Sequence, residues 1–209
     1  MMALLCALQW SGGPAWANTE AADKKPVILV VGDSLSAEYG LQRGSGWVSL
    51  IAQRLQAKSA AYQIRNTSIS GDTTSGGVSR LPAALSQYQP EIVIIELGAN
   101  DALRGLSLSA TEKNLSTMIS LSQQAQARVL LLGMQIPPNY GRQYTERFQA
   151  LFSRLSSQHD TALTPFLMEG IATDRSMFQA DGIHPNEQAQ SILADNVWAQ
   201  LAPMITPLP

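Results

Sequence analysis

Two short segments near opposite ends of the chain carry the residue types that nucleophilic catalysis needs. Ser34 stands in the turn GDS directly after the apolar run VILVV, and Asp181 and His184 stand in the segment DGIHP. A serine hydroxyl is a poor nucleophile at neutral pH and needs a base, for which the imidazole of His184 is the candidate. Asp181 can reach the far ring nitrogen across the small Gly182 and fix the tautomer of the imidazole. The spacing predicts a catalytic triad of Ser34, Asp181 and His184.

Attack on a carbonyl group creates an oxyanion, which needs hydrogen-bond donors to stabilise it. The predicted donors of this oxyanion hole are the backbone N–H of Ser34, the backbone N–H of Gly71 and the side-chain amide of Asn100. Glycine at position 71 lets the backbone approach a substrate closely. The three donors follow three different predicted strands, so a sheet must bring them together.

Each segment alone also fits a turn or a helix cap, because such features use Gly, Asp, Ser and Asn. Their occurrence together, at successive predicted strand ends, favours the catalytic interpretation. Three rival acids, Asp33, Asp72 and Asp101, are interpreted as local turn-forming residues. His159 lies in the polar segment SSQHD and is interpreted as a solvated surface histidine.

Short apolar runs alternate with longer stretches whose apolar residues recur at helical spacing. The runs VILVV and IVIIEL are nearly continuous, which is typical of parallel strands covered by helices on both faces. Pro82 is expected to kink or restart its helix. The expected strands are 27–31, 62–67, 92–97, 129–132 and 162–164, and the expected helices are 46–57, 75–87, 111–125, a segment around 148–155, and 186–201.

This alternation predicts an α/β fold with three α/β/α layers and a doubly wound, parallel, five-stranded sheet. Ligands of such sheets bind beyond the carboxyl ends of the strands, where the strand order reverses. The commonest order that places the first strand between the second and third is the flavodoxin-like 2-1-3-4-5. In that order Gly71 and Asn100 flank Ser34 from either side.

Composition excludes several classes of function. The 209 residues, 45% of them hydrophobic and 14% charged, suffice for one domain, predicted at 27–202, with a loose tail at 203–209. A net charge of −2 gives no electrostatic footprint for nucleic acid, and no apolar run is long enough to span a bilayer. Cys6 is the only cysteine, and His159 and His184 are the only histidines. We therefore expect no cofactor and no metal. The expected partner is a small-molecule substrate, with no nucleic acid and no stable membrane insertion, and the protein is expected to be a monomer.

The first residues differ in character from the rest. Residues 1–17 carry no charge, have an apolar front half and end in the small-x-small pattern Ala15-Trp16-Ala17, as a secretory leader does. No Lys or Arg precedes Lys24, so an N-terminal extension is the alternative. The leader, followed by a linker at 18–26, predicts a periplasmic or secreted protein.

The segments GDSLS, ISGDTTSGG, GAND and DGIHP resemble the four sequence blocks of the SGNH (GDSL-type) hydrolases. The catalytic serine, oxyanion glycine and asparagine, acid and histidine of that family match Ser34, Gly71, Asn100, Asp181 and His184. The resemblance covers roughly residues 27–201 and is closest to the bacterial periplasmic branch of acyl-CoA thioesterase I, lysophospholipase and arylesterase. It implies a secreted serine hydrolase with a metal-free triad that cleaves esters and often thioesters through an acyl-serine.

Two loops offer apolar surface for a substrate. They are expected either to wall an acyl-chain groove or merely to close the end of the core. A carbohydrate O-acetyl esterase or acyltransferase on the same scaffold is the alternative enzyme. A non-catalytic binding protein is a third interpretation, although GDSLSAEYG is not the phosphate-binding pattern G-x-G-x-x-G. No G-x-S-x-G elbow indicates an ordinary α/β-hydrolase. The loop residues singled out are Ile136, Pro137, Pro138, Tyr140, Phe166, Leu167, Met168, Met177 and Phe178.

Overall fold

The computed structural model describes residues 25–58 and 62–205. The predicted leader with Cys6, most of the linker, and residues 206–209 of the predicted tail lie outside the described residues. Five strands form one sheet in the order β2-β1-β3-β4-β5, and each neighbouring pair is parallel. The α/β class and the predicted strand order are therefore confirmed. The strands are β1 Val27–Gly32, β2 Gln63–Asn66, β3 Ile92–Glu96, β4 Arg128–Leu132 and β5 Ala162–Thr164.

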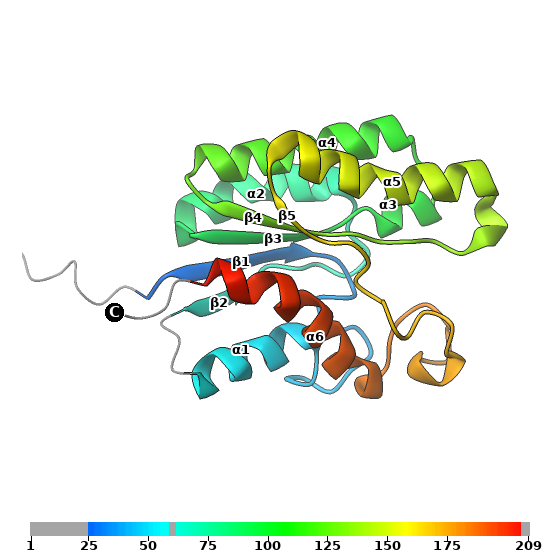
Figure 1. Ribbon diagram of the computed structural model, residues 1–209, viewed down its shortest axis with the longest axis horizontal. Helices are drawn as coiled ribbons and strands as arrows, with labels where there is room; N and C mark the ends of the chain where they lie inside the picture. The colour runs from blue at the N-terminus through cyan, green and yellow to red at the C-terminus, as the bar shows by residue number, and fades with distance from the viewer. Residues whose placement is uncertain (1–24, 59–61, 206–209) are drawn as a thin grey trace, which may run out of the picture.

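Helices cover both faces of the sheet (Figure 1). Helices α1 and α6 pack together on one face, while α2, α4 and α5 pack side by side on the other. The helices are α1 Trp47–Ala57, α2 Thr74–Tyr88, α3 Ala99–Leu103, α4 Leu108–Gln124, α5 Arg142–His159 and α6 Gln190–Leu201. Short 3-10 turns occur at Pro138–Tyr140, Arg175–Met177, Glu187–Ala189 and Ala202–Met204.

The sheet is the centre of the core. Every residue of β1 and β3 is buried, because each of these strands has helices above and below it. Burying one Val, Leu or Ile side chain is worth roughly 1.5–3 kcal/mol, so these two strands supply much of the apolar stabilisation. On the α5 side, Phe148 packs edge-to-face against Phe152 with ring centroids 5.3 Å apart.

Three local features differ from the sequence-based expectation. Helix α2 runs without interruption through Pro82, which lies on the exposed face, where solvent can bond the carbonyl that loses its donor. The last helix begins at Gln190 rather than at residue 186, after a 3-10 turn at Glu187–Ala189. Helix α3, which carries Asn100, was not expected, because its five residues are too few to show a helical period.

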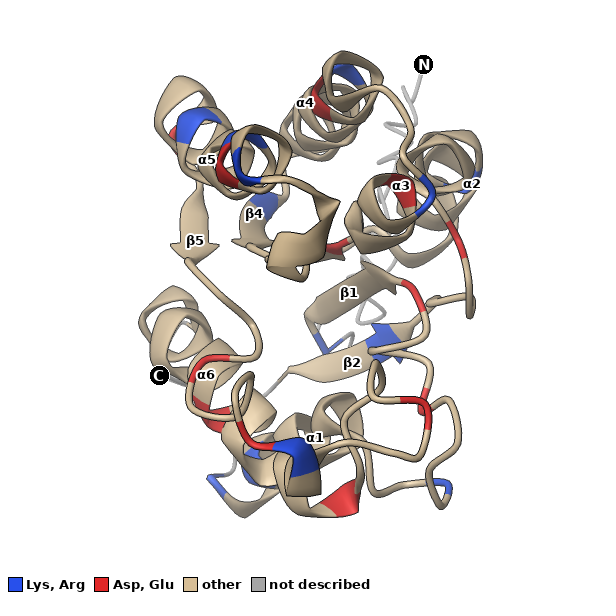
Figure 2. Ribbon diagram, turned by 90° about the vertical axis from the view of Figure 1, so that its right-hand side faces the viewer, with Lys and Arg blue, Asp and Glu red and all other residues tan. Residues whose placement is uncertain are grey.

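All five strands point toward the same edge of the sheet, and the loops that follow them gather there. Figure 2 views this edge end-on and shows acidic and basic residues in separate small groups rather than as one charged surface. Among the described residues, no helix is both long and apolar enough to cross a membrane.

Candidate active site

The end of β1 presents Ser34. Gly32 pairs in register with Glu96 of β3, and a side chain at position 32 would collide with Ser36 and Glu96. Glycine is therefore needed where the strand turns. The carboxylate of Asp33 accepts the backbone N–H of Leu35 at 3.0 Å, which closes the turn. Ser34 is left half-buried, with its side chain facing a cavity.

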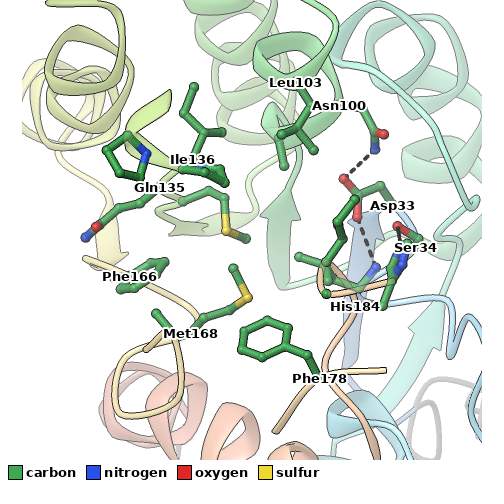
Figure 3. A pocket seen from close by; sticks show the side chains of 18 residues that line it. Asp33, Ser34, Asn100, Leu103, Gln135, Ile136, Phe166, Met168, Phe178 and His184 are labelled. Carbon is green, nitrogen blue, oxygen red and sulfur yellow. Dashed lines mark hydrogen bonds between the residues drawn. The ribbon is translucent and has the colours of Figure 1, made fainter. Parts of the chain in front are cut away.

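Figure 3 shows Ser34 beside His184, which lies in the segment before α6 and is also bonded to Asp181. The Oγ of Ser34 lies 2.9 Å from Nε2 of His184, and Nδ1 of His184 lies 2.6 Å from Oδ2 of Asp181. Asp181 also accepts the backbone N–H groups of Ile183 and His184 through Oδ1. Gly182 has φ +72°, a conformation that favours glycine and lets the segment curl around the carboxylate.

The charge of Asp181 is favoured by these contacts. Burial by itself raises the pKa of its carboxyl group. The hydrogen bonds from the His184 ring and from the Ile183 and His184 N–H groups outweigh that effect and lower the pKa to about 2. Asp181 is therefore an anion throughout the neutral range and can stabilise a protonated imidazole.

Backbone contacts hold the loop that carries His184. The guanidinium group of Arg175 donates to the carbonyl oxygens of Phe178, Gln179 and Ala180, at 3.4, 2.7 and 2.8 Å. The backbone N–H of Gln179 donates to the carbonyl of His184 at 2.8 Å. Further bonds cross the loop from the Gln179 side chain to the carbonyl of Pro185, at 3.2 Å, and from the Asn186 N–H to the carbonyl of Met177, at 2.8 Å.

A second loop covers the imidazole. The ring of Tyr39 packs on the ring of His184, with centroids 4.5 Å apart. Glu38, which has a positive φ of 58°, accepts the N–H groups of Gly44 and Gly46 and the hydroxyl of Ser49. The hydrogen bonds of this carboxylate hold the conformation of the loop in which Tyr39 packs against His184.

The predicted oxyanion donors lie on both sides of the Ser34 turn. The loop after β2 is tied to β1 by the N–H of Ile69, which donates to the carbonyl of Gly32 at 3.1 Å. Gly71 in that loop has φ +76°, and its carbonyl accepts a bond of 2.7 Å from Arg104. On the other side, Asn100 lines the same cavity as Ser34, whereas Gly71 does not.

Asp33 and Glu96 were not expected to matter beyond local structure. Asp33 was predicted to be a turn-former, and it does cap Leu35, but it is also buried and accepts the side-chain amide of Asn100 at 2.8 Å. No role for Glu96 was predicted from the sequence. The signal that could have revealed it is a single acid at the end of an otherwise apolar strand.

A cavity of about 440 Å³ opens beside Ser34, which is within the usual range for small-molecule sites. Figure 3 shows apolar side chains from three loops around it, with Ser34, Asn100 and His184 at one end. Of the predicted groove residues, Tyr140, Leu167 and Met177 lie outside its lining. The residues that line it include Ile136, Pro137, Pro138, Phe166, Met168 and Phe178, together with Leu35, Leu103, Met134 and Ile183.

The remaining polar residues that the sequence raised serve other contacts. His159 is half-buried rather than solvated, and its Nε2 lies 2.8 Å from the hydroxyl of Ser116 on α4. Asp72 forms an ion pair of 2.8 Å with Arg80. Asp101 is buried and accepts the backbone N–H of Thr74 at 2.9 Å, so it holds the start of α2 rather than a turn.

A parallel sheet with a Ser–His–Asp chain at its carboxyl edge is the arrangement of a serine hydrolase. The sequence pattern of the GDSL-like Lipase/Acylhydrolase family matches residues 30–192, and the chain belongs to that family.

Known relatives agree with this assignment. The chain is 47% identical to "Esterase TesA" of Pseudomonas aeruginosa over 85% of its own length and 89% of that protein. It is 42% identical to "Thioesterase 1/protease 1/lysophospholipase L1" of Escherichia coli K12, over 85% of this chain and 84% of the relative. The crystal structure of the psychrotrophic esterase EstA from Pseudoalteromonas sp., inhibited by monoethylphosphonate, superposes with a TM-score of 0.81. It shares 40% sequence identity, and the match covers 85% of this chain and 97% of that one.

Proposed function

We propose that the protein hydrolyses carboxylic esters and thioesters through an acyl-serine on Ser34. The observation that carries the proposal is the Ser34–His184–Asp181 hydrogen-bond chain, with links of 2.9 and 2.6 Å, at one end of an apolar cavity. The esterase, thioesterase and lysophospholipase named among the relatives support the substrate class.

The first half of the reaction acylates the serine. As the Oγ of Ser34 attacks the substrate carbonyl, Nε2 of His184 takes the hydroxyl proton. Asp181 stabilises the imidazolium that results. The tetrahedral intermediate places its negative oxygen toward the N–H of Gly71, the N–H of Ser34 and the amide of Asn100. The intermediate collapses, and His184 gives the proton to the departing alcohol or thiol.

The second half releases the acid. A water molecule replaces the leaving group beside His184, which takes one of its protons as the oxygen attacks the acyl-serine carbonyl. The same donors stabilise the second oxyanion, and the proton returns to the Oγ of Ser34 as the carboxylic acid departs.

The apolar cavity is proposed to hold the acyl chain. Ile136, Phe166 and Phe178 face the space beside the nucleophile (Figure 3). Each buried methylene is worth about 0.8 kcal/mol, so a cavity lined in this way favours a longer chain until it is full.

The chain is further proposed to act as a monomer in the periplasm or outside the cell. The uncharged residues 1–17, with their apolar front half and the small-x-small ending Ala15-Trp16-Ala17, support export.

The test is a rate panel on the purified protein and on Ser34→Ala, with aryl esters, acyl-CoAs and lysophospholipids side by side. Turnover of at least one class by the wild type, lost in Ser34→Ala, is expected. A preference confined to acetyl groups would instead favour the carbohydrate O-acetyl esterase hypothesis, and no serine-dependent turnover in any class would overturn the proposal.

A further inference from the structure

Two buried acids lie directly beneath Ser34, and the mechanism proposed above uses neither. Asp33 and Glu96 are each only 1% exposed. Glu96 ends β3 beside Gly32, and Asp33 follows Gly32 in the chain, so the two carboxyl groups meet where β1 turns toward the nucleophile. Buried acids are rare because ionised carboxylates are costly to remove from water, which makes a pair at this place unusual.

Glu96, at the end of β3, holds the turn that follows β1 through two hydrogen bonds. Its Oε2 accepts the backbone N–H of Asp33 at 3.1 Å and the hydroxyl of Ser36 at 2.7 Å. These two donors stand on either side of Ser34 in the chain. Glu96 therefore fixes the turn on both sides of the nucleophile.

Asp33 connects that turn to Asn100. Its Oδ1 accepts the N–H of Leu35 at 3.0 Å, and its Oδ2 accepts the side-chain Nδ2 of Asn100 at 2.8 Å (Figure 3). Both oxygens of this carboxylate are thus used, each by one N–H donor.

The contact with Asp33 decides which way the Asn100 amide faces. The oxygen and nitrogen of an asparagine amide have nearly the same shape, so packing alone does not choose between two orientations related by a flip. An ionised carboxylate only accepts hydrogen bonds, so it draws the NH₂ end of Asn100 toward itself. The second hydrogen of that NH₂ group is then the one that can face an oxyanion, whereas a flipped amide would present its oxygen.

We propose that Asp33 is a positioning residue that orients the Asn100 amide as an oxyanion donor, and that Glu96 holds Asp33 in place for this task. The proposal rests on the proposed function, because it assigns a purpose to a contact of the predicted oxyanion hole. Asp33 acts through Asn100 and is not itself a catalytic residue.

The charge state of the pair agrees with these roles. Two hydrogen-bonded carboxyl groups in a buried site do not both ionise readily. Burial, followed by the charge of Asp33, raises the pKa of Glu96 well above its ordinary value. Burial also raises the pKa of Asp33, to about 6, while bonds from Leu35, Glu96 and Asn100 oppose the rise.

The pKa of Glu96 is thus held well above its ordinary value by burial and by the charge of Asp33, so the pair favours the proton on Glu96 and the negative charge on Asp33. Other charged or titratable groups face the pair from two sides. The ring of His184 favours the charge on Asp33, and Arg80 of α2 donates to the carbonyl of Gly32 at 3.0 Å.

The test is a double-mutant cycle in the full-length protein, with an aryl ester as substrate. Asparagine has one acceptor oxygen where aspartate has two, so Asp33→Asn leaves either Leu35 N–H or the Asn100 amide without an acceptor. We expect kcat to fall about 10- to 100-fold with KM within about twofold, because an oxyanion donor acts only in the transition state. In the Asn100→Ala background the same change is expected to cost less than about threefold.

Variants of Asp33 and of Glu96 test the interpretation further. Asp33→Ser keeps an oxygen for Leu35 N–H but is too short to reach Asn100, so it should lose kcat as Asp33→Asn does, even where Asp33→Asn fails to fold. Glu96→Gln keeps both an acceptor and a donor and should retain more turnover than Glu96→Leu. Glu91→Gln, the same change at an exposed position just before β3, is the matched control.

Equal losses from the position-33 variant in the wild-type and Asn100→Ala backgrounds would overturn the proposal, as would a rise in KM with kcat unchanged. Failure of the proposed function would look different, since Ser34→Ala would then retain the turnover of the wild type.

Discussion

The Nε2 atom of His184 lies 2.9 Å from the Oγ of Ser34, although 150 positions separate the two residues in the chain. Ser34 reaches this place at the end of a buried central strand, and His184 reaches it in a loop tied together by Arg175. The contact therefore depends on the whole sheet as well as on two local segments.

Removal of the nucleophile or the base should abolish turnover. Ser34→Ala and His184→Ala are each expected to lower kcat on the order of 10⁶-fold, because the members of a triad act as a unit. Asp181→Asn should lower it by about 10⁴-fold through loss of the correct tautomer. Steady-state rates on an aryl ester measure these effects. His159→Ala is the control for His184→Ala, and a comparable loss from it would show that the wrong histidine has been assigned as base.

Removal of the asparagine donor should affect the transition state more than binding. Asn100→Ala is expected to lower kcat by about 10²–10³-fold, with KM nearly unchanged. A purely structural role for Asn100 would instead lower the thermal midpoint while kcat per folded molecule stayed constant, so the rates are measured alongside thermal unfolding.

The guanidinium of Arg175 should matter for turnover although it lies outside the triad. Arg175→Ala removes three hydrogen bonds to the loop before Asp181, and a loosened His184 should lower kcat by about 10-fold, as small misplacements of catalytic groups do. Arg142→Ala is the matched control, because Arg142 is exposed and pairs with the neighbouring Glu146 on the same helix. Similar rates for the two variants would contradict the positioning role.

Chain-length preference tests the apolar cavity. The value of kcat/KM should rise about fourfold for each added methylene until the cavity is filled, since a buried methylene is worth about 0.8 kcal/mol. Ile136→Ala should change the length at which the rise stops, whereas Leu106→Ala, at an exposed position outside the cavity lining, should not. A flat or falling profile, or one indifferent to Ile136→Ala, argues against an acyl groove.

Glu96→Gln should change how stability depends on pH. An acid whose pKa is raised on folding binds its proton more tightly in the folded state. Its contribution to stability is therefore complete below its ordinary pKa and is lost as pH rises toward the folded pKa. Because glutamine has no such proton to lose, the stability of Glu96→Gln should gain on that of the wild type as pH rises above 4.5, the ordinary pKa of a glutamate, by up to about 1.4 kcal/mol per pH unit.

Thermal unfolding at several pH values measures this difference, with Glu91→Gln as the matched control. A constant difference between Glu96→Gln and the wild type as pH rises above 4.5 would mean that Glu96 is already ionised in the folded protein. Asp181 has the opposite shift, so its contribution to stability is present above its ordinary pKa and is lost as pH falls toward about 2.

Much of the fold could be predicted from the sequence, because the strands are short apolar runs between longer periodic stretches. The strand order 2-1-3-4-5 was predicted because it puts the first strand between the second and third, so that Gly71 and Asn100 flank Ser34. The structure has that order. Helix α3 could not be predicted, since five residues carry no readable period.

The parts of the site that depend on characteristic residue types could be predicted from the sequence. The parts that depend on contacts between distant side chains could not. Ser34, Asp181 and His184 were grouped from their residue types and their places after predicted strands, and the structure places their side chains in one hydrogen-bonded chain. Glu96 was overlooked because a lone acid at a strand end usually reaches solvent. Its burial depends on Gly32, whose missing side chain makes room for the carboxyl group.

The most direct test of the account is to label the protein with a serine-directed phosphonate and to locate the adduct by peptide mass spectrometry. One adduct per chain on Ser34 is expected, formed in proportion to the loss of ester hydrolysis and absent from Ser34→Ala. An adduct on another residue, or full turnover by protein labelled at Ser34, would contradict the account.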